Sequence, residues 1–306
     1  MSDLARHAED YLSVRRALGF KLKREGEILP KLVAYLEAAG AAALTTELAV
    51  AWARQPEGVH PINWSQRLGA VHGFAAYLET IDPRTQVPPC DVFPRSARRP
   101  PPYLWSKGNV HRLLEATRQI RPTLRAATHE ALFGLLAVSG LRLGEALNLQ
   151  RDDIDLAEGL LTIREAKFGR SRLVPLHRST THALRSYAAR RDRFCPTPKA
   201  KTFFVSSVGT ALLACGVQKT FNQLTTAIGL RTATARPRIH DLRHSLAVHA
   251  LVQWHQSGAD VQGHMPVLST YLGHVNPSST YWYLSASPEL MELAAARLDG
   301  RFGARR

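Results

Sequence analysis

The sequence predicts a mainly α-helical protein of two domains, the second of which carries a small β-hairpin. Three observations support this prediction. Apolar residues recur at helical spacing through residues 3–80, seven prolines crowd residues 83–102, and two short apolar runs at 160–164 and 172–176 flank a turn. Spacings of three to four residues are typical of amphipathic helices, whereas short apolar runs joined by a turn are typical of a hairpin.

The N-terminal domain, residues 1–82, is expected to be a bundle of four short helices. Gly19 and Gly40 end the first two segments, and Pro30 is expected near the start of the second. The four segments run from Leu4 to about Gly19, from about Ile28 to Ala39, from Thr45 or Thr46 to Trp52, and from Asn63 to Leu78.

Residues 83–102 are predicted to be an interdomain linker. Proline density of this kind opposes both helix and sheet and favours a semi-rigid extended spacer. The stretch also holds Arg95, Arg98 and Arg99. These arginines, like the earlier Lys21, Lys23 and Arg24, are predicted to contact phosphates, although single exposed charges can equally be solvated surface residues.

The second domain, residues 103–306, is expected to combine helices with the hairpin. Helices are predicted at about 106–118 and 124–138, followed by a break at Ser139-Gly140 and a short helix at 143–149. The strands at 160–164 and 172–176 enclose the turn Lys167-Phe168-Gly169-Arg170, and the rest is predicted to be helical to the end. The last helix is predicted at about 288–298, with an apolar stripe that can pack on its own domain.

Charge is the most informative part of the composition. Forty Lys and Arg against 25 Asp and Glu give a formal net charge of +15 in 306 residues. Such a surplus favours binding to a polyanion, of which DNA is the commonest in a cytoplasmic protein. A solubility surface or a membrane-facing patch is the alternative explanation.

The remaining composition favours a soluble cytoplasmic protein. No apolar run reaches the length of about 18 residues that spans a bilayer, and the first residues lack the apolar core of a signal peptide. Cys90, Cys195 and Cys215 lie far apart without CxxC spacing. They are expected to be unpaired thiols in a reducing compartment, and a structural zinc site is not expected.

Two cations stand at turns of the second domain. Arg142, in Ser139-Gly140-Leu141-Arg142-Leu143-Gly144-Glu145, lies between a helix stop and a new helix, where its guanidinium can point out of the fold. Glu145 shares its face and can hold it in place, unless the two form an ordinary surface pair. Lys167 at the hairpin tip can deliver a proton to a leaving oxygen, although a turn lysine is usually just solvated.

His240-Asp241-Leu242-Arg243-His244 is the third segment of interest. His240 and Arg243 share a helix face, so that they can donate together to a phosphate, while Leu242 points to the core. His240 and His244 also have a spacing that suits zinc. The glutamate of HExxH is absent, however, and an arginine between two ligands would repel a cation, so a metal site is not predicted.

The fourth segment is Tyr271-Leu272-Gly273-His274-Val275-Asn276-Pro277, followed by Ser278-Ser279-Thr280-Tyr281-Trp282-Tyr283. Gly273 ends one helix and leaves His274 at its exposed end. Asn276 and Pro277 are expected to begin a further helix that carries both Tyr281 and Tyr283. Tyrosines at helical spacing are usually part of a core, so at least one of the two is expected to be structural.

In this order, the segments resemble the active site of the tyrosine recombinase, or phage integrase, family. Arg142 in SGLRLGE resembles the family's first arginine, and Lys167 in AKFGRSRLVPL its hairpin lysine. His240 and Arg243 match the His-x-x-Arg pair, and His274 in YLGH the last histidine. Tyr283 falls nine residues after His274, at the spacing of the nucleophile, whereas Tyr281 does not.

The resemblance covers about residues 105–290, and the helical N-terminal part resembles the family's SAM-like core-binding domain more loosely. It implies strand cleavage by Tyr283 through a 3′-phosphotyrosyl bond, with Arg142, Arg243 and His274 on the phosphate and Lys167 protonating the leaving 5′ oxygen. His240 or Lys167 would transfer protons. No cofactor, metal or ATP is expected. Glu145 is expected to support Arg142, and Arg170 and Arg172 beside the turn are predicted as further DNA contacts.

The resemblance also implies partners. Double-stranded DNA would lie in a C-shaped clamp of the two domains, and the active form would be a homotetramer on DNA. The resemblance implies that the last helix docks on a neighbouring protomer, and packing on its own domain is the alternative. One departure from compact family members is the 31-residue separation between Arg243 and His274. The stretch Trp254–Met265 is interpreted as a loop insertion, which makes His264 a decoy for His274.

Three other functions are weighed against site-specific recombination. A type IB topoisomerase uses a similar set of residues, but the four-helix N-terminal domain favours recombination. A catalytically silent DNA-binding protein would not need competent side chains at all six positions. A metal-dependent hydrolase that draws on the 13 histidines fails on ligand spacing.

Overall fold

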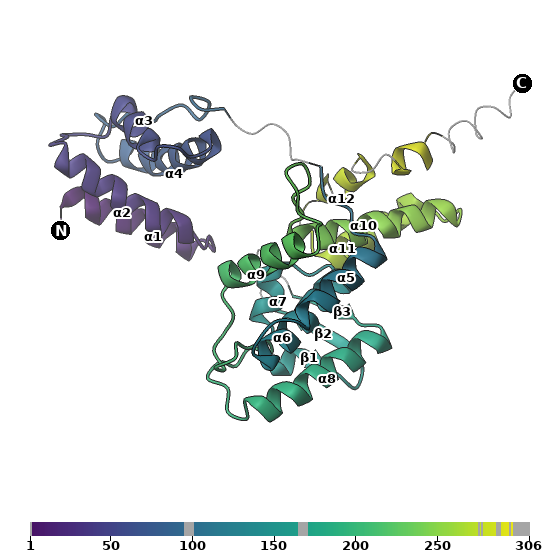
Figure 1. Ribbon diagram of the computed structural model, residues 1–306. Coiled ribbons are helices and arrows are strands. Elements are labelled where there is room, and N and C mark those ends of the chain that lie inside the picture. The colour runs from purple at the N-terminus through teal and green to yellow at the C-terminus, as the bar shows by residue number, and fades with distance from the viewer. Residues whose placement is uncertain are drawn as a thin grey trace, which may run out of the picture. The chain divides into compact units, whose positions relative to one another are not determined.

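The computed structural model describes residues 2–94, 101–164, 171–274, 276, 278–285, 289–293 and 295. The chain forms two compact units, Met1–Pro100 and Pro101–Arg306 (Figure 1), each with its own hydrophobic core. Most of the described residues are helical, and one three-stranded sheet lies in the second unit. The predicted fold class, mainly α with a small sheet, is therefore confirmed.

The first unit contains the four predicted helices, which close over an apolar core. Leu29, Leu32 and Trp52 lie inside this core with at most 1% of each residue exposed. Thr45 caps the third helix, because its hydroxyl accepts from the Leu48 N–H at 3.3 Å. The helices are α1 Asp3–Ala17, α2 Lys23–Ala38, α3 Thr46–Arg54 and α4 Pro61–Glu79.

Helix α2 begins earlier than the sequence indicated. Pro30 was expected near its start, but the helix already begins at Lys23 and Pro30 lies inside it. The proline costs one backbone hydrogen bond, to the carbonyl of Gly26 four residues earlier. Burial of Leu29 and Leu32 on the same helix offsets that loss.

The described part of the predicted linker packs on the first unit. Phe93 is 3% exposed within its core, and its ring lies 5.9 Å from that of Trp64. The Gln86 N–H donates to the Leu44 carbonyl at 2.8 Å. Residues 83–94 therefore do not form a free spacer, because apolar and backbone contacts hold them against the helices.

The second unit combines its sheet with helices of very different length. Helices α6 and α10 supply many of its buried residues. Its elements are α5 Lys107–Thr117, α6 Thr123–Ser139, α7 Leu143–Asn148, the 3-10 turn η1 Arg151–Asp153, β1 Ile154–Asp155, β2 Leu160–Ile163, β3 Arg172–Pro175, α8 Arg178–Phe194, α9 Ala214–Ala227, α10 Ile239–Gln256, α11 Val261–Leu272, α12 Ser278–Tyr281 and the 3-10 turn η3 Trp282–Ser285.

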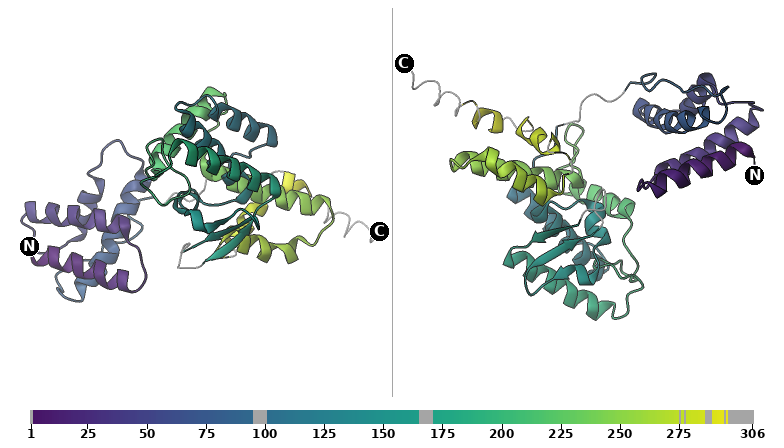
Figure 2. Two further views of the ribbon diagram at one scale, coloured as in Figure 1. Left: turned by 90° about the horizontal axis from the view of Figure 1, so that it is seen from below. Right: turned by 180° about the vertical axis from the view of Figure 1, so that it is seen from behind.

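The sheet has one more strand than predicted. The three strands, labelled in Figure 1 and drawn as arrows in the views of Figure 2, are antiparallel in the order β1-β2-β3. Ile163 pairs with Arg172 at the base of the hairpin. Strand β1 has only two residues, Ile154 and Asp155, which is too short to produce an apolar alternation in the sequence. The turn residues 165–170, which include Lys167 and Arg170, lie outside the described residues.

Two predictions for the second half of the chain were wrong. Residues 195–213 are not helical but form a loop that places Phe203 and Phe204 in the core, with Pro196 and Pro198 at its start. The stretch Trp254–Met265 is no loop insertion. Helix α10 continues to Gln256, and α11 starts at Val261 after a short turn.

That turn is defined by a helix cap. The carboxylate of Asp260 accepts from the Gly263 N–H at 3.1 Å, and Val261, Met265 and Leu268 then bury the inner face of α11. A helical spacing of apolar residues is therefore present in the segment that was interpreted as a loop.

The end of the chain is only partly described. The helix predicted to carry both tyrosines is short: Tyr281 closes α12, and Tyr283 lies in η3. Asn276 caps α12 as expected, since its side chain accepts from the Ser278 N–H at 3.0 Å. Residues 289–293 are helical, and Leu290 packs in cis against α10 and α11 with 1% exposed. In the part of the chain that the structure describes, no helix has the length and apolarity of a membrane span.

Candidate active site

Arg142 and Arg243 are held by carbonyl groups at the ends of two helices. Helix α6 ends at Gly140 and α11 at Gly273, both with positive φ, 62° and 67°. Arg243 donates to the carbonyls of Gly140 at 2.5 Å and Leu272 at 2.6 Å, and Arg142 donates to the Gly273 carbonyl at 2.9 Å. Carbonyls at helix C-termini lack intrahelical donors and carry partial negative charge, so they stabilise these guanidinium groups side by side.

Glu145 binds Arg142 twice. Its carboxylate accepts from the Arg142 main-chain N–H at 2.9 Å and from the guanidinium at 2.7 Å, which confirms the predicted contact. Burial raises the pKa of Glu145, but hydrogen bonds from Arg172 and Arg142 outweigh that effect and lower the pKa to about 2. The carboxylate is therefore ionised at neutral pH, and the pair is not an ordinary surface pair.

Arg172 does not lie where the sequence suggested. Its side chain is 9% exposed, and its guanidinium donates to both oxygens of Glu145 and to the Tyr271 carbonyl. Arg172 was predicted to contact DNA, but in this structure its side chain is buried by contacts within the protein. The pairing joins residues 27 positions apart, and no local spacing in the sequence indicates it.

The two predicted histidines lie close to the two arginines. Loss of hydration, followed by the charges of Arg243 and Arg142, lowers the pKa of both His240 and His274 to about 4. Both rings are therefore neutral at pH 7 in the free protein. The His274 ring Nδ1 lies 2.7 Å from the hydroxyl of Thr280, which is fully buried.

Tyr283 and Tyr281 have opposite environments. Tyr283 is 2% exposed, and its ring stacks on that of His274 at 5.9 Å between centroids. A hydrogen bond with Tyr283 is among the contacts that oppose the lowering of the Arg243 pKa, which burial and Arg142 bring to about 10. Tyr281 is 49% exposed. The structure thus brings Tyr283 together with Arg142, Arg243, His240 and His274.

Sequence reasoning missed two neighbours of this cluster. His244 is buried, and its ring lies 5.3 Å from Tyr283 and 4.5 Å from His240. Its position one turn after His240 was a signal, but it was considered only as a metal ligand. Thr280, three residues before Tyr283, was not singled out.

The predicted DNA contacts are only partly visible. Lys21, Lys23 and Arg24 are exposed at the start of α2, and Arg24 also donates to Gln66. The other predicted contacts in the linker and the hairpin, namely Arg95, Arg98, Arg99 and Arg170, lie outside the described residues together with Lys167.

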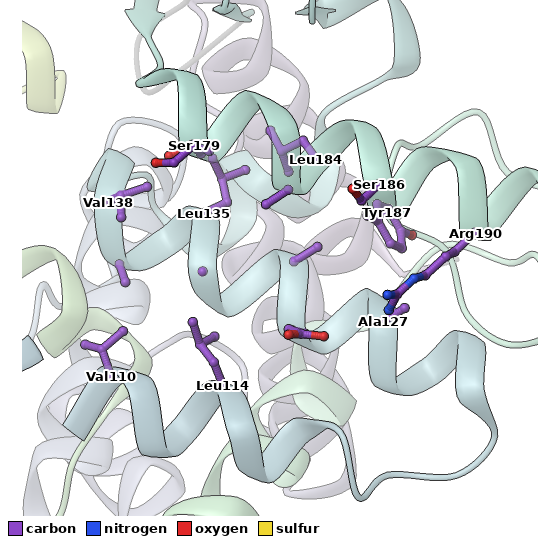
Figure 3. A pocket seen from close by; sticks show the side chains of 16 residues that line it. Val110, Leu114, Ala127, Leu135, Val138, Ser179, Leu184, Ser186, Tyr187 and Arg190 are labelled. Atoms are coloured by element: carbon purple, nitrogen blue, oxygen red, sulfur yellow. The ribbon is translucent and has the colours of Figure 1, made fainter. Parts of the chain in front are cut away.

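Two other kinds of site were sought within the described residues. No group of three or more His, Cys, Asp or Glu residues there could hold a metal ion. A cavity of about 300 Å³ lies between α5, α6 and α8 and is lined mainly by apolar side chains such as Leu114, Leu135 and Leu184 (Figure 3). It includes none of the predicted catalytic residues that the structure describes.

Comparison with known proteins decides the family. The sequence model of the phage integrase family matches residues 106–289, which include the whole cluster. The chain belongs to the phage integrase family. As a tyrosine recombinase of this family, it is an enzyme that breaks and rejoins DNA strands.

Individual relatives agree with this assignment. The protein y4rB of Sinorhizobium fredii, named as an integrase/recombinase, is 46% identical over 99% of both chains. The integrase of transposon Tn1549, solved with transposon right end DNA, shares the fold with a TM-score of 0.65 at 15% identity, covering 96% of this chain and 98% of that one. Lambda integrase, solved as a tetramer on a Holliday junction, has a TM-score of 0.58 at 16% identity, with coverage of 90% and 79%.

Proposed function

We propose that this tyrosine recombinase cleaves and religates duplex DNA at specific sites through a 3′-phosphotyrosyl bond to Tyr283, without a divalent metal ion or ATP. The observation that carries the proposal is the enclosure of Tyr283 beside Arg243 and His274, while Tyr281 is 49% exposed. A nucleophile has to lie beside the groups that bind the scissile phosphate, and of the two tyrosines only Tyr283 does.

Arg142, Arg243 and His274 would bind the phosphate. An arginine has five N–H donors, so the bonds to helix-end carbonyls leave donors for the non-bridging oxygens. His274 is neutral, and its Nδ1 lies 2.7 Å from the buried Thr280 hydroxyl. If this hydroxyl donates to Nδ1, the ring proton lies on Nε2 and can be donated to the phosphate. All three groups would thus stabilise the negative charge that grows on the pentacoordinate phosphate.

The chemical step is an in-line displacement. The Tyr283 oxygen attacks phosphorus, the bond between phosphorus and the 5′ oxygen breaks, and the leaving oxygen takes a proton from Lys167. The phenol has an unperturbed pKa of about 10, so its proton has to be accepted during attack. His240 suits this role, because its neutral ring can accept a proton once the bound phosphate offsets the positive charges around it.

Religation reverses these steps. A 5′-hydroxyl attacks the phosphotyrosyl bond, Tyr283 leaves, and the phosphodiester forms again. The covalent bond conserves the energy of the broken phosphodiester, so the reaction needs no ATP. The guanidinium groups supply the charge that a metal ion supplies in other phosphoryl-transfer enzymes.

The proposed partners are duplex DNA and three further copies of the chain. The net charge of +15 and the exposed Lys21, Lys23 and Arg24 favour a DNA backbone. The shared fold with an integrase tetramer on a Holliday junction supports a tetramer on DNA. Such a protein would act in the cytoplasm, in contact with the nucleoid.

The proposal is tested with a nicked duplex that carries the ends of the DNA element encoding the protein. The substrate is incubated with the protein in EDTA and without ATP. The expected result is a covalent protein–DNA adduct that survives SDS, and four-stranded junctions on paired intact sites. Tight DNA binding without any adduct would contradict it and indicate a silent DNA-binding protein.

A further inference from the structure

Three consecutive carbonyl groups at the end of α11 bind three different arginines. The carbonyl of Tyr271 accepts from Arg172 at 3.1 Å. The carbonyls of Leu272 and Gly273 accept from Arg243 and Arg142, at 2.6 and 2.9 Å. His274 follows directly. Arg142 and Arg243 have a part in the proposed cleavage, whereas Arg172 has none so far.

Arg172 also shares Glu145 with Arg142. Its Nη1 and Nη2 donate to the two carboxylate oxygens at 3.2 and 2.8 Å. Arg142 donates to the same two oxygens from its guanidinium and its main-chain N–H. The Glu145 carboxylate therefore accepts hydrogen bonds from two guanidinium groups at once. Without Arg172, it would neutralise Arg142 alone and draw its positive charge away from a phosphate.

The backbone at Gly273, next to His274, lies in close contact with the Arg172 guanidinium. A Cβ atom on Gly273 would lie 2.6 Å from the Arg172 Nη1, and φ at this glycine is +67°. The end of α11 can therefore approach the guanidinium closely only because residue 273 has no side chain. Removing Arg172 would leave a space beneath the segment that carries His274.

Arg172 stands at the base of the hairpin as well. It is the first residue of β3 and pairs with Ile163, the last residue of β2. Its side chain thus connects this strand to α7, through Glu145, and to the end of α11.

We propose that Arg172 is a positioning residue for strand cleavage: it holds Arg142 and His274 in place through Glu145 and the end of α11, and it fixes strand β3 to both. This inference rests on the proposed function. A side chain that is 9% exposed and donates to three acceptors has to act through its neighbours rather than on the DNA.

The test uses the full-length chain and the nicked duplex, with Arg172→Lys and Arg172→Gln. Lysine keeps the positive charge but cannot form the bidentate hydrogen bonds to Glu145 that arginine forms. The rate of adduct formation at saturating protein is measured separately from DNA affinity over a range of salt concentrations. Both variants are expected to form the adduct roughly a hundredfold more slowly, the size of effect that a small misplacement of catalytic groups produces, with DNA affinity within about twofold.

Arg164 offers a matched control at the same end of the sheet. It follows β2, its side chain is 63% exposed, and its ion pair is with Asp153, outside the site. Arg164→Lys and Arg164→Gln are expected to cleave at the wild-type rate. Melting curves confirm that each variant is folded. If Arg172→Gln is unstable, Arg172→Lys remains informative, because it keeps the charge and the long side chain.

A second arm distinguishes positioning from a general structural role. Because Glu145 and Arg172 act as one unit, the double variant Glu145→Gln/Arg172→Gln is expected to cleave no more slowly than the slower single variant. Additive losses would contradict the proposal. Direct phosphate contact by Arg172 would instead leave the cleavage rate unchanged and weaken DNA affinity. The slope of log affinity against log salt concentration would then fall by about one. If the wild type forms no adduct, it is the proposed function that fails.

Discussion

His240 and His274 make the free enzyme sensitive to acid. Their pKa of about 4 in the folded protein lies below the value of about 6.5 that histidine has in an unfolded chain. Between these values the unfolded chain binds more protons, so both groups stabilise the fold fully above about pH 6.5 and lose this contribution as the pH falls toward 4.

We therefore predict that the melting temperature of the DNA-free protein falls by several degrees between pH 7.5 and pH 5. The variant His274→Asn should show a smaller decrease, because one of the two groups is removed. His264→Asn serves as the control, since this exposed histidine lies outside the site, and it should retain the full decrease. Equal pH dependence in all three proteins would contradict the assigned protonation states.

In the proposed mechanism, the Thr280 hydroxyl determines which ring nitrogen of His274 carries the proton. Replacement by valine keeps the shape of the side chain but removes the hydroxyl beside Nδ1. We expect Thr280→Val to slow adduct formation roughly fivefold to tenfold, the rate equivalent of one neutral hydrogen bond. Thr270→Val is the control, because its exposed hydroxyl bonds only the Pro266 carbonyl among the described contacts. A similar loss in both variants would show that the effect is not specific to His274.

At the scale of elements, the site depends on how helices α6 and α11 end. Gly140 and Gly273 both adopt positive φ, and their own carbonyls accept hydrogen bonds from Arg243 and Arg142. A side chain on Gly273 would also meet Arg172. Two properties of one glycine, its conformation and its lack of Cβ, are therefore required at the same place.

Gly273→Ala and Gly258→Ala separate these two requirements. Both glycines have positive φ, but nothing lies within 4 Å of a Cβ at position 258. Gly258→Ala should cost only the left-handed strain of about 1–2 kcal/mol in the free energy of unfolding. Gly273→Ala should cost more and also slow adduct formation at saturating DNA. Equal losses of stability with equal cleavage rates would contradict the role of the α11 end.

The sequence indicated much of this site because its signals are local. Gly140 and Gly273 as helix ends, the Arg142–Glu145 spacing, and the shared face of His240 and Arg243 all follow from residues a few positions apart. The contact of Arg172 with Glu145 joins separate elements, and no periodicity reveals it. The stretch Trp254–Met265 was misjudged because the 31-residue separation between Arg243 and His274 suggested an insertion. The Asp260 cap and the apolar spacing of Val261, Met265 and Leu268 instead form a helix.

At the scale of the whole molecule, the surplus of 15 positive charges is distributed unevenly along the chain. Asp260 is the only Asp, Glu, Lys or Arg between Arg243 and Glu289, a stretch that includes His274 and Tyr283. The cations available to a DNA backbone therefore come mainly from other segments, such as the start of α2, where Lys21, Lys23 and Arg24 are exposed. Each phosphate that such a cation contacts releases counterions.

DNA affinity should therefore depend strongly on salt. We expect the equilibrium affinity for duplex DNA to fall about 10³-fold or more between 50 and 200 mM salt, as for a protein with at least about six phosphate contacts. The triple substitution of Lys21, Lys23 and Arg24 by glutamine should reduce the slope without changing adduct formation at saturating protein. An unchanged slope would show that this part of the first unit does not contact the backbone.

During strand cleavage, Tyr283 is expected to become covalently joined to DNA without a metal ion. The most direct measurement is peptide mapping by mass spectrometry of the adduct formed on nicked duplex in EDTA. We expect a nucleotide on Tyr283, no adduct for Tyr283→Phe, and a wild-type amount of adduct for Tyr281→Phe. A nucleotide on Tyr281, or an adduct that forms only when a divalent metal ion is added, would contradict it.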